Sequence, residues 1–364
     1  MKITIFGLTL SSSWGNGHAT PYRALIRALD RMGHRVRFYE KDVPYYARHR
    51  DAGDPSYCDL VLYPDWNTVR SEALKHAADS DVVVVASYCP EGARISDEMF
   101  GLPGPMKVFY DLDTPVTFSK FEEQGGTEYL EPKQISAFDL ILSFTGGKAL
   151  RRLEEEFGAP MARPLYGCVD PDYYRRTEAN PTLQCDLSYM GTYAPDRQEK
   201  LERFFLDPAR NATASQFLLA GSLYPWEWSW PANVNKLDHV APDAHPLLYS
   251  SSRLTLNITR KDMAESGYCP SGRFFEAAAC GCPIVTDTWE GLESFFSDEE
   301  VLPVNSSAAV LEALRLLDSE LHRFADAARQ RTLDEHTGAY RAQEMLRYFD
   351  EARARSNRAR SEVA

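Results

Sequence analysis

Residues 266–287, SGYCPSGRFFEAAACGCPIVTD, combine polar and charged side chains with small residues. Ser271 follows a proline and is a favourable helix N-cap, so the pattern predicts a short helix that begins at Gly272. The free amides at the start of a helix, together with the Arg273 guanidinium, suit a phosphate group. Glu276 lies one turn further along the same face, about where a ribose attached to that phosphate would lie.

A simpler interpretation of this stretch is an ordinary βαβ unit in which Arg273 and Glu276 form a weak ion pair on the surface. The nearby Cys280 and Cys282 suggest half of a metal site, but no second pair of cysteine or histidine residues has suitable spacing. We therefore interpret them as core residues and expect no metal. The chain has seven cysteines, an odd number without regular spacing, which argues against a disulfide framework.

Three further residues are expected near the same ligand. Arg197 lies in the first turn of a helix that Pro195 opens, where a positive charge is unfavourable and therefore hints at a bound anion. A solvated arginine is the alternative. Asn257 and Arg260 end a predicted strand just before residues 266–287 and should reach the same crevice.

A glycine-rich loop follows the first predicted strand and contains Gly15, Asn16, Gly17 and His18. Its glycines allow the backbone to approach a ligand closely, and a helix N-terminus lowers the pKa of a histidine and favours its neutral, basic form. The spacing differs from the dinucleotide-binding GxGxxG pattern. An ordinary glycine-rich turn with a surface histidine fits these residues equally well.

Two carboxylates, Asp111 and Asp113, follow another predicted strand. At a strand end they could act as a base, hold substrate hydroxyls or bind a divalent metal, or Asp113 could simply cap the next segment. Residues 145–148, TGGK, lack the upstream glycine of the GxxxxGK phosphate-binding loop. We therefore reject a P-loop nucleoside triphosphatase.

Strand and helix patterns alternate in both halves of the chain and must position these residues. Strands are predicted at 2–6, 36–40, 59–63, 81–87, 107–110 and 139–144, and then at 186–190, 216–220, 234–240, 253–259, 283–286 and 301–304. Nearly continuous apolar strands such as VVVVA are typical of a parallel sheet covered on both faces. The pattern therefore predicts an α/β protein with doubly wound sheets and ligands at the carboxyl ends of the strands. From residue 306 the chain is predicted to be helical, with a frayed tail at 353–360.

Composition excludes several classes of protein. The 364 residues are long enough for two domains, and 44 % of them are apolar, which is ordinary for a globular protein. The formal net charge of −13 argues against nucleic acid or an anionic membrane as the general partner. No apolar run reaches transmembrane length, and the first residues turn polar too soon for a signal peptide, so a cytoplasmic location is expected.

Several motifs together resemble a known family. They are MGTYAPDRQ, LNITR, the residues 266–287 and GLESFF in the second half, and YDLDTPVT and SFTGGKAL in the first. With its two doubly wound halves, the chain resembles the CgeB-type group 1 glycosyltransferases (spore maturation protein CgeB-like), whose fold is GT-B. The resemblance covers nearly the whole chain.

The resemblance implies an acceptor domain at 1–170, a donor domain at 183–335, a cleft between them, and a last helix at 336–364 that packs back on the first domain. It implies transfer of a sugar, of hexose type, from a nucleoside-diphosphate sugar to an acceptor hydroxyl, without an essential metal or other cofactor. His18 and Asp113 would be the catalytic residues. The donor-binding residues would be Gly15, Asn16, Gly17, Arg197, Asn257, Arg260, Ser271, Gly272, Arg273 and Glu276.

One position departs from the group 1 pattern. Glu276 matches the second glutamate of the E-x7-E motif, but Tyr268 stands where the first glutamate is expected. The usual retention of anomeric configuration is therefore left open. Two other functions share the donor contacts, a UDP-sugar 2-epimerase and a non-catalytic nucleotide-sugar-binding protein.

Overall fold

The computed structural model describes residues 1–225 and 228–363, and it divides the chain into two compact units. The first unit contains residues 1–168 together with the chain from 338 onward, and the second contains residues 169–337. Residues 171–182, which we expected to link two domains, are part of the second unit because Tyr174 is buried there.

The first unit is built on a seven-stranded sheet in the order β3-β2-β1-β4-β5-β6-β7, and its paired strands are all parallel. Its strands are β1 (Lys2–Gly7), β2 (Arg35–Lys41), β3 (Asp59–Tyr63), β4 (Val82–Ala86), β5 (Met106–Asp111), β6 (Leu140–Ser143) and β7 (Ala162–Pro164). The sequence missed only β7, which is three residues long. All five residues of β4 are buried, as a strand covered on both faces requires.

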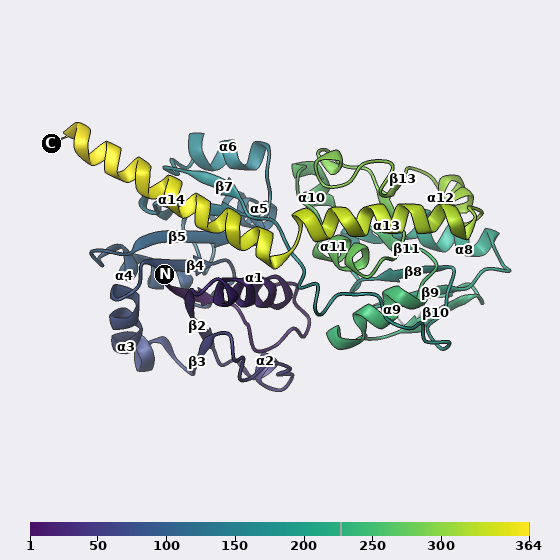
Figure 1. Ribbon diagram of the computed structural model, residues 1–364, viewed down its shortest axis with the longest axis horizontal. Coiled ribbons are helices and arrows are strands. Elements are labelled where there is room, and N and C mark those ends of the chain that lie inside the picture. The colour runs from purple at the N-terminus through teal and green to yellow at the C-terminus, as the bar shows by residue number, and fades with distance from the viewer. Residues whose placement is uncertain (226–227, 364) are drawn as a thin grey trace. The chain divides into compact units, whose positions relative to one another are not determined.

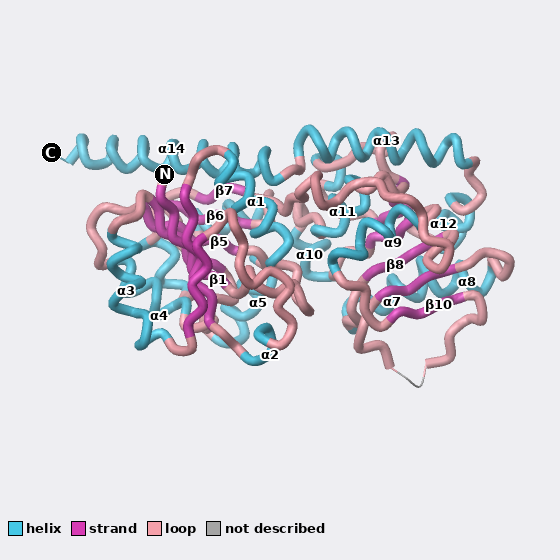
Figure 2. Tube along the Cα trace, turned by 60° about the horizontal axis from the view of Figure 1, so that its bottom comes forward, coloured by secondary structure: helices cyan, strands magenta, loops and turns pink. Residues whose placement is uncertain are grey.

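Helices cover both faces of this sheet (Figures 1 and 2). One face packs on α1 (Ala19–Arg31) and α14 (Gly338–Val363), and the other on α3 (Trp66–Ala78), α4 (Gly92–Phe100), α5 (Thr114–Gln124) and α6 (Lys148–Glu155). The short α2 (Pro44–Ala47) follows β2, and a 3-10 turn (Pro132–Ala137) precedes β6. Helices α1 and α14 meet closely at Gly338, where a Cβ atom would lie 2.3 Å from the carbonyl oxygen of Ala24. A larger residue at 338 would therefore force the two helices apart.

The last helix is longer than the sequence indicated. We expected fraying from residue 353, but α14 continues to Val363. Ala352 is buried against the first sheet, and Arg347 pairs with Glu351 one turn later. The helix therefore continues beyond Ala352 through a polar sequence that is typical of a solvated end.

The second unit contains a six-stranded parallel sheet in the order β10-β9-β8-β11-β12-β13. Its strands are β8 (Leu187–Met190), β9 (Phe217–Ala220), β10 (Val234–Leu237), β11 (Thr255–Asn257), β12 (Ile284–Asp287) and β13 (Leu302–Val304). Its helices are α7 (Gln198–Leu201), α8 (Asp207–Asn211), α9 (His245–Ser251), α10 (Lys261–Ser266), α11 (Gly272–Ala279), α12 (Ser307–Ala313) and α13 (Asp318–Glu335), with 3-10 turns at Pro242–Ala244 and Leu292–Ser294. Both sheets confirm the predicted doubly wound α/β class.

The helical run that Pro195 opens changes its geometry along its length. It begins as a 3-10 turn (Pro195–Arg197), continues through α7, passes through a π-helical turn (Glu202–Leu206) and ends with α8 at Asn211. Phe204, Phe205 and Leu206 are buried, so the widened turn allows three successive side chains to enter the core.

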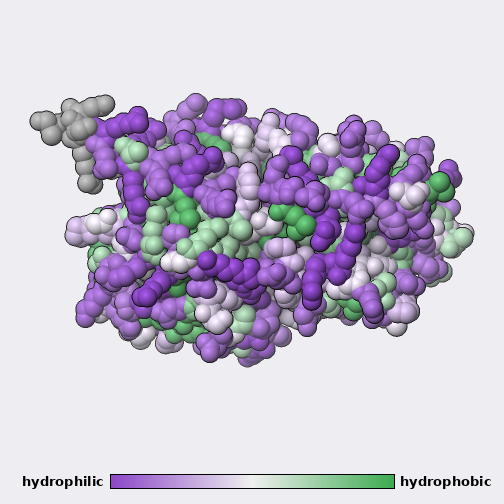
Figure 3. Space-filling view, in the orientation of Figure 1, coloured by the Kyte–Doolittle hydropathy of each residue, from purple (hydrophilic) through white to green (hydrophobic). Residues whose placement is uncertain are grey.

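The surface in Figure 3 is mostly hydrophilic and the cysteines are unpaired, as the composition and cysteine spacing indicated. On the face shown in Figure 3, hydrophilic residues predominate over both units, and hydrophobic residues form scattered patches. Among the described residues, no helix combines the length and the apolar character needed to span a membrane. All seven cysteines are free, and Cys280 and Cys282 are buried, which confirms that they are core residues.

Candidate functional site

Two arginines converge on the turn that follows β8. Arg197 is only 8 % exposed and donates from Nη2 to the carbonyl oxygen of Thr192 at 2.5 Å. Arg273 donates from Nη1 to the carbonyl oxygen of Met190 at 2.7 Å. Burial lowers the pKa of Arg197, and the neighbouring positive charge of Arg273 lowers it further.

Asp196 is the carboxylate whose charge acts on Arg197, and it is itself bonded to Arg260. Within residues 1–225 and 228–363, neither Arg197 nor Arg273 forms an ion pair, and the buried Nε atom of Arg197 has no hydrogen-bond partner. Two positive charges close together repel each other, and such an arrangement is expected where an anionic ligand binds between them. The turn after β8 is therefore a candidate anion site.

Helix α11 begins at the same edge of the sheet. Ser271 is its N-cap, as the sequence predicted, although its side chain makes no capping hydrogen bond. The space around Gly272 is open, since a Cβ atom there would meet no other atom within 4 Å. The first amides of α11 and its positive end thus lie beside Arg273, which begins the same helix.

Glu276 is buried rather than paired on the surface. It is 7 % exposed, and its Oε2 atom has no hydrogen-bond partner in the described part of the chain. The nearest ring nitrogen is Nδ1 of His245, 3.7 Å away. The simpler interpretation, a surface ion pair between Arg273 and Glu276, is therefore wrong.

Each ring nitrogen of His245 has a neighbour other than Glu276. Nε2 of His245 lies 3.2 Å from the carbonyl oxygen of Val240, and Nδ1 lies 3.4 Å from the hydroxyl of Tyr174. The first contact requires a proton on Nε2, so Nδ1 accepts from Tyr174 in the neutral ring. A buried carboxylate oxygen without a donor is suited to accept a hydrogen bond from a ligand hydroxyl.

The other predicted residues of the second unit divide into two groups. Asn257 donates to the hydroxyl of Thr286 at 3.1 Å and lines one small pocket together with Arg273. Arg260 instead donates from Nε to Asp196 at 3.2 Å. The structure thus places Asn257 beside Arg273, whereas the charge of Arg260 is shared with a carboxylate.

Lys200 and Asp287 form an ion pair that the sequence did not indicate. Lys200 donates to Oδ2 of Asp287 at 2.6 Å and to the carbonyl oxygen of Thr259 at 3.2 Å. Oδ1 of Asp287 accepts from both the amide and the hydroxyl of Thr259. Burial raises the pKa of Asp287, and Lys200 opposes that shift. This ion pair ties the helix that follows Arg197 to the end of β12.

Tyr268 occupies the position where the group 1 pattern has a glutamate. Its φ angle is +46°, its amide donates to the carbonyl oxygen of Glu290 at 2.7 Å, and its ring packs where a side chain of Gly291 would lie. An aromatic ring therefore fills this position, and it brings no carboxylate.

In the first unit, the loop after β1 is fixed by a buried carboxylate. Glu40, at the end of β2, accepts from the amides of Leu10 and Ser11 at 2.7 and 2.8 Å. It also accepts from the hydroxyls of Ser11 at 2.6 Å and Thr9 at 3.0 Å. A carboxylate with four donors holds the loop in one conformation.

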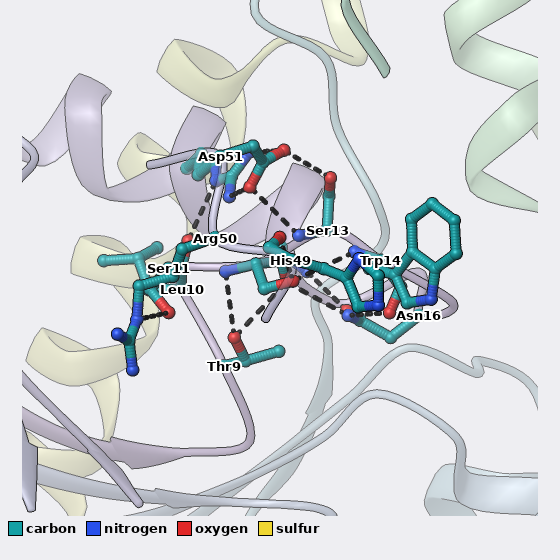
Figure 4. A network of polar contacts seen from close by, with 12 residues as sticks. Thr9, Leu10, Ser11, Ser13, Trp14, Asn16, His49, Arg50 and Asp51 are labelled. Atoms are coloured by element: carbon teal, nitrogen blue, oxygen red, sulfur yellow. Dashed lines mark hydrogen bonds and ion pairs between the residues drawn. The ribbon is translucent and has the colours of Figure 1, made fainter. Parts of the chain in front are cut away.

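A second set of contacts joins this loop to residues 49–51 (Figure 4). Ser13 donates to Asp51 from both its amide and its hydroxyl, and the Ser12 hydroxyl donates to the carbonyl oxygen of His49. The rings of Trp14 and His49 are stacked 4.2 Å apart, and Tyr45, 55 % exposed, meets the His49 ring edge-on. The two segments form one rigid, partly exposed aromatic face.

The side chain of Asn16 forms hydrogen bonds within its own loop and to the start of α1. Its side-chain oxygen accepts from the amides of His18 and Ala19, and its Nδ2 donates to the carbonyl oxygens of Ser12 and Trp14. Asn16 thus caps α1.

The two glycines beside Asn16 differ in their surroundings. Gly15 has a φ of +64°, and a Cβ atom there would lie 2.5 Å from the hydroxyl of Tyr45. Gly17 is open on all sides. A donor contact by Gly15, Asn16 or Gly17 stays a prediction.

His18 begins α1 with its Nδ1 atom buried and without a hydrogen-bond partner among the described residues. Burial lowers the pKa of His18 to about 4. The sequence predicted a lowered pKa but assigned it to the helix terminus, whereas the dominant cause is loss of solvent. The imidazole is therefore neutral at pH 7.

Tyr88 brings His18 and Asp113 together, and no pattern in the sequence pointed to it. Its hydroxyl donates to Oδ2 of Asp113 at 2.9 Å, and its ring lies 5.2 Å from the His18 ring. Asp113 is the N-cap residue of α5 but makes no side-chain capping bond. The capping interpretation is therefore wrong for its side chain.

Asp111 lies deeper than Asp113. Its Oδ1 atom accepts from the amide of Asp113 at 3.0 Å, and burial raises the pKa of Asp111 to about 6. Among the residues that the structure describes, no group of three or more His, Cys, Asp or Glu side chains is arranged to hold a metal ion.

Comparison with known proteins agrees with this fold. Residues 197–347 match a family described as glycosyl transferase-like, a range that begins at Arg197 and includes all of α11. Comparison with curated protein sequences finds no significant match.

Solved structures match over nearly the whole chain. An alpha-glucosyltransferase in complex with UDP has a TM-score of 0.73 and 13 % identity over 96 % of this chain and 100 % of that one. Sucrose-phosphate synthase from Thermosynechococcus elongatus has a TM-score of 0.66 and 12 % identity, covering 97 % and 99 % of the two chains. Anabaena HepE in complex with UDP and glucose has a TM-score of 0.64 and 11 % identity, covering 96 % and 100 %. These likenesses show the GT-B fold, and the narrower CgeB-type resemblance stays a prediction.

Proposed function

We propose that this protein is a glycosyltransferase that moves a hexosyl group from a nucleoside-diphosphate sugar to an acceptor hydroxyl. The observation that carries the proposal is the convergence of Arg197 and Arg273 on the turn after β8, where neither forms an ion pair within the described residues. A diphosphate supplies the missing negative charge. The glycosyl transferase-like match of residues 197–347 supports the same function, and the narrower CgeB-type assignment is part of this proposal.

The donor site follows from the positions of three groups. The guanidiniums of Arg197 and Arg273 and the first amides of α11 would bind the diphosphate. They would also stabilise the negative charge that develops on it when the bond to the sugar breaks. Glu276, buried with one free oxygen, would accept hydrogen bonds from the ribose hydroxyls. Asn257 and Arg260 belong to the proposed donor site as well, Asn257 through the pocket that it lines with Arg273.

The acceptor site is proposed for the first unit. His18 is neutral at pH 7 and would take the proton of the acceptor hydroxyl, while Asp113 would orient that hydroxyl. We propose that no essential metal takes part, since the two arginines provide the positive charge that the leaving group needs.

A binding and turnover experiment tests the proposal. The thermal unfolding midpoint is measured with UDP, GDP, ADP and dTDP, because a ligand at 100 times its dissociation constant adds about 2.7 kcal/mol of stability. UDP is the first probe, since structures similar to this chain contain it. The nucleotide that binds is then supplied as its glucose conjugate, with and without EDTA.

The outcomes separate the candidate functions. Slow release of free nucleoside diphosphate that persists in EDTA supports the transferase. Epimerised donor without release supports the epimerase, and tight binding without any reaction supports a binding protein. Failure of all four nucleotides to stabilise the wild-type protein would remove the donor site from the second unit.

A further inference from the structure

Tyr88 contacts both residues proposed to act on the acceptor. Its hydroxyl donates to Asp113, and its ring packs edge-on against His18 at an interplanar angle of 71°. His18 begins α1 and Asp113 begins α5, so neither element by itself brings the two side chains together. The contact comes from a third segment, the loop between β4 and α4.

The backbone of Tyr88 is held in an unusual conformation. Its φ angle is +62°, in the left-handed region that side chains other than glycine rarely adopt. The preceding residue is fixed to β5, because the amide of Ser87 donates to the carbonyl oxygen of Tyr110 and its hydroxyl accepts from the amide of Leu112. Strain of this kind persists where the surroundings determine it, and it concentrates at functional sites.

We propose that Tyr88 is a positioning residue that holds the Asp113 carboxylate and the His18 imidazole in one catalytic arrangement. The left-handed backbone directs the ring between them, and the hydroxyl fixes the Asp113 carboxylate. This inference rests on the proposed function for its effect on turnover, but its effect on Asp113 can be measured without any reaction.

The charged and titratable groups around Tyr88 define what its hydroxyl can do. These groups are His18, Asp111, Asp113, Lys120 and Tyr129. Burial and the negative charge of Asp113 raise the pKa of Tyr88, so its hydroxyl keeps its proton and acts only as a donor. The Lys120 ammonium lies 5.0 Å from the centre of the Tyr88 ring and adds a cation–π contact.

The first test measures Asp113 directly. Tyr88→Phe keeps the ring and removes only the hydroxyl, so the pKa of Asp113, followed through its carboxyl carbon by NMR, should rise by about one unit. Tyr39→Phe is the matched control, because it removes a buried hydroxyl that bonds to Nδ1 of His76. An unchanged pKa of Asp113 in Tyr88→Phe, or the same shift in Tyr39→Phe, would overturn the proposal.

The second test measures turnover with UDP-glucose as the probe. In Tyr88→Phe we expect kcat to fall about tenfold, with the UDP dissociation constant unchanged. The limb of the pH–rate profile that requires ionised Asp113 should move to higher pH, because the pKa of Asp113 has risen. Tyr39→Phe should change neither quantity. Absence of wild-type turnover with every donor would contradict the proposed function and leave the NMR titration to decide the role of Tyr88.

Discussion

The loops that follow β1 and β8 have the same place in their two sheets, after a central strand and before a helical segment, yet they are held in opposite ways. In the first unit, the carboxylate of Glu40 collects amide and hydroxyl donors from the loop. In the second unit, guanidiniums donate to carbonyl oxygens of the loop. One loop therefore has an internal anion, and the other has an excess of cations.

The difference shows how one architecture can support two kinds of site. In the loop after β1, the amides of Leu10 and Ser11 already donate to Glu40, so they are not available to a phosphate. The two guanidiniums at the loop after β8 donate to carbonyl oxygens and form no ion pair within the described residues. The charge of each loop therefore depends on the side chains that hold it, and not on the fold that the two units share.

The largest effect is expected at His18, which tests whether the first unit contributes chemistry. His18→Ala should lower kcat by about 10²–10⁴-fold, because a general base is lost, while UDP affinity stays unchanged. Asp113→Asn should act in the same direction. Steady-state kinetics and calorimetric titration with UDP measure the two quantities. His34→Ala, a half-buried histidine near the N-terminal amine, is the control. A defect in UDP binding alone would contradict the assignment.

Glu40→Gln tests whether the internal anion holds the first loop. The NH2 group of glutamine would lie against the amide and hydroxyl donors of the loop and could not accept their hydrogen bonds. We therefore expect a loss of about 3 kcal/mol in the free energy of unfolding. Urea denaturation measures this loss. Asp79→Asn, which removes an exposed ion pair with Lys2, should leave stability unchanged. Equal stability of the two variants would show that Glu40 does not hold the loop.

Arg197→Ala and Arg273→Ala test the positive charge of the second loop. Each variant loses a charged hydrogen bond to the diphosphate, of about 1.5–3 kcal/mol, so UDP affinity should fall tenfold or more. Arg203→Ala is the control within the same helical run, because Arg203 is exposed and paired with Glu199. Unchanged affinity in both site variants would place the phosphate elsewhere.

Glu276→Gln tests the ribose contact with a smaller expected effect. UDP affinity should fall by up to about tenfold, because the ribose hydroxyl would donate to a neutral amide oxygen instead of a charged carboxylate. The wild-type protein should also bind 2′-deoxy-UDP or 3′-deoxy-UDP more weakly than UDP, and the variant should discriminate less. Equal discrimination in both proteins would separate Glu276 from the ribose.

The smallest effect concerns pH near neutrality. Because burial lowers the pKa of His18 to about 4, the neutral base is fully present above its ordinary pKa of 6.5 and is lost only as the pH falls toward 4. Turnover should therefore be nearly flat from pH 8 to pH 6. A limb of the pH–rate profile near pH 6.5 that disappears in His18→Ala would show that His18 is solvated. The first unit would then not contain a buried neutral base.

The order of strands and helices and several local features follow from short stretches of the sequence. The run VVVVA, the alternation of strands and helices, and the Pro-Ser-Gly start of α11 depend on neighbouring residues, so they were visible without tertiary contacts. The same reasoning placed His18 at the start of one helix and Glu276 one turn into another. It missed the three-residue strand β7, which is held by pairing with β6, and it ended α14 too early.

Which of these residues contact one another depends on how distant segments of the chain fold together. Arg273 bonds to a carbonyl 83 positions earlier in the chain, and Tyr88 bonds to Asp113 across 25 positions. Contacts at such separations leave no periodic trace in the sequence. Burial is likewise a property of the folded chain, so the loss of solvent that makes His18 neutral and leaves Glu276 an unpaired acceptor could not be derived from residue types alone.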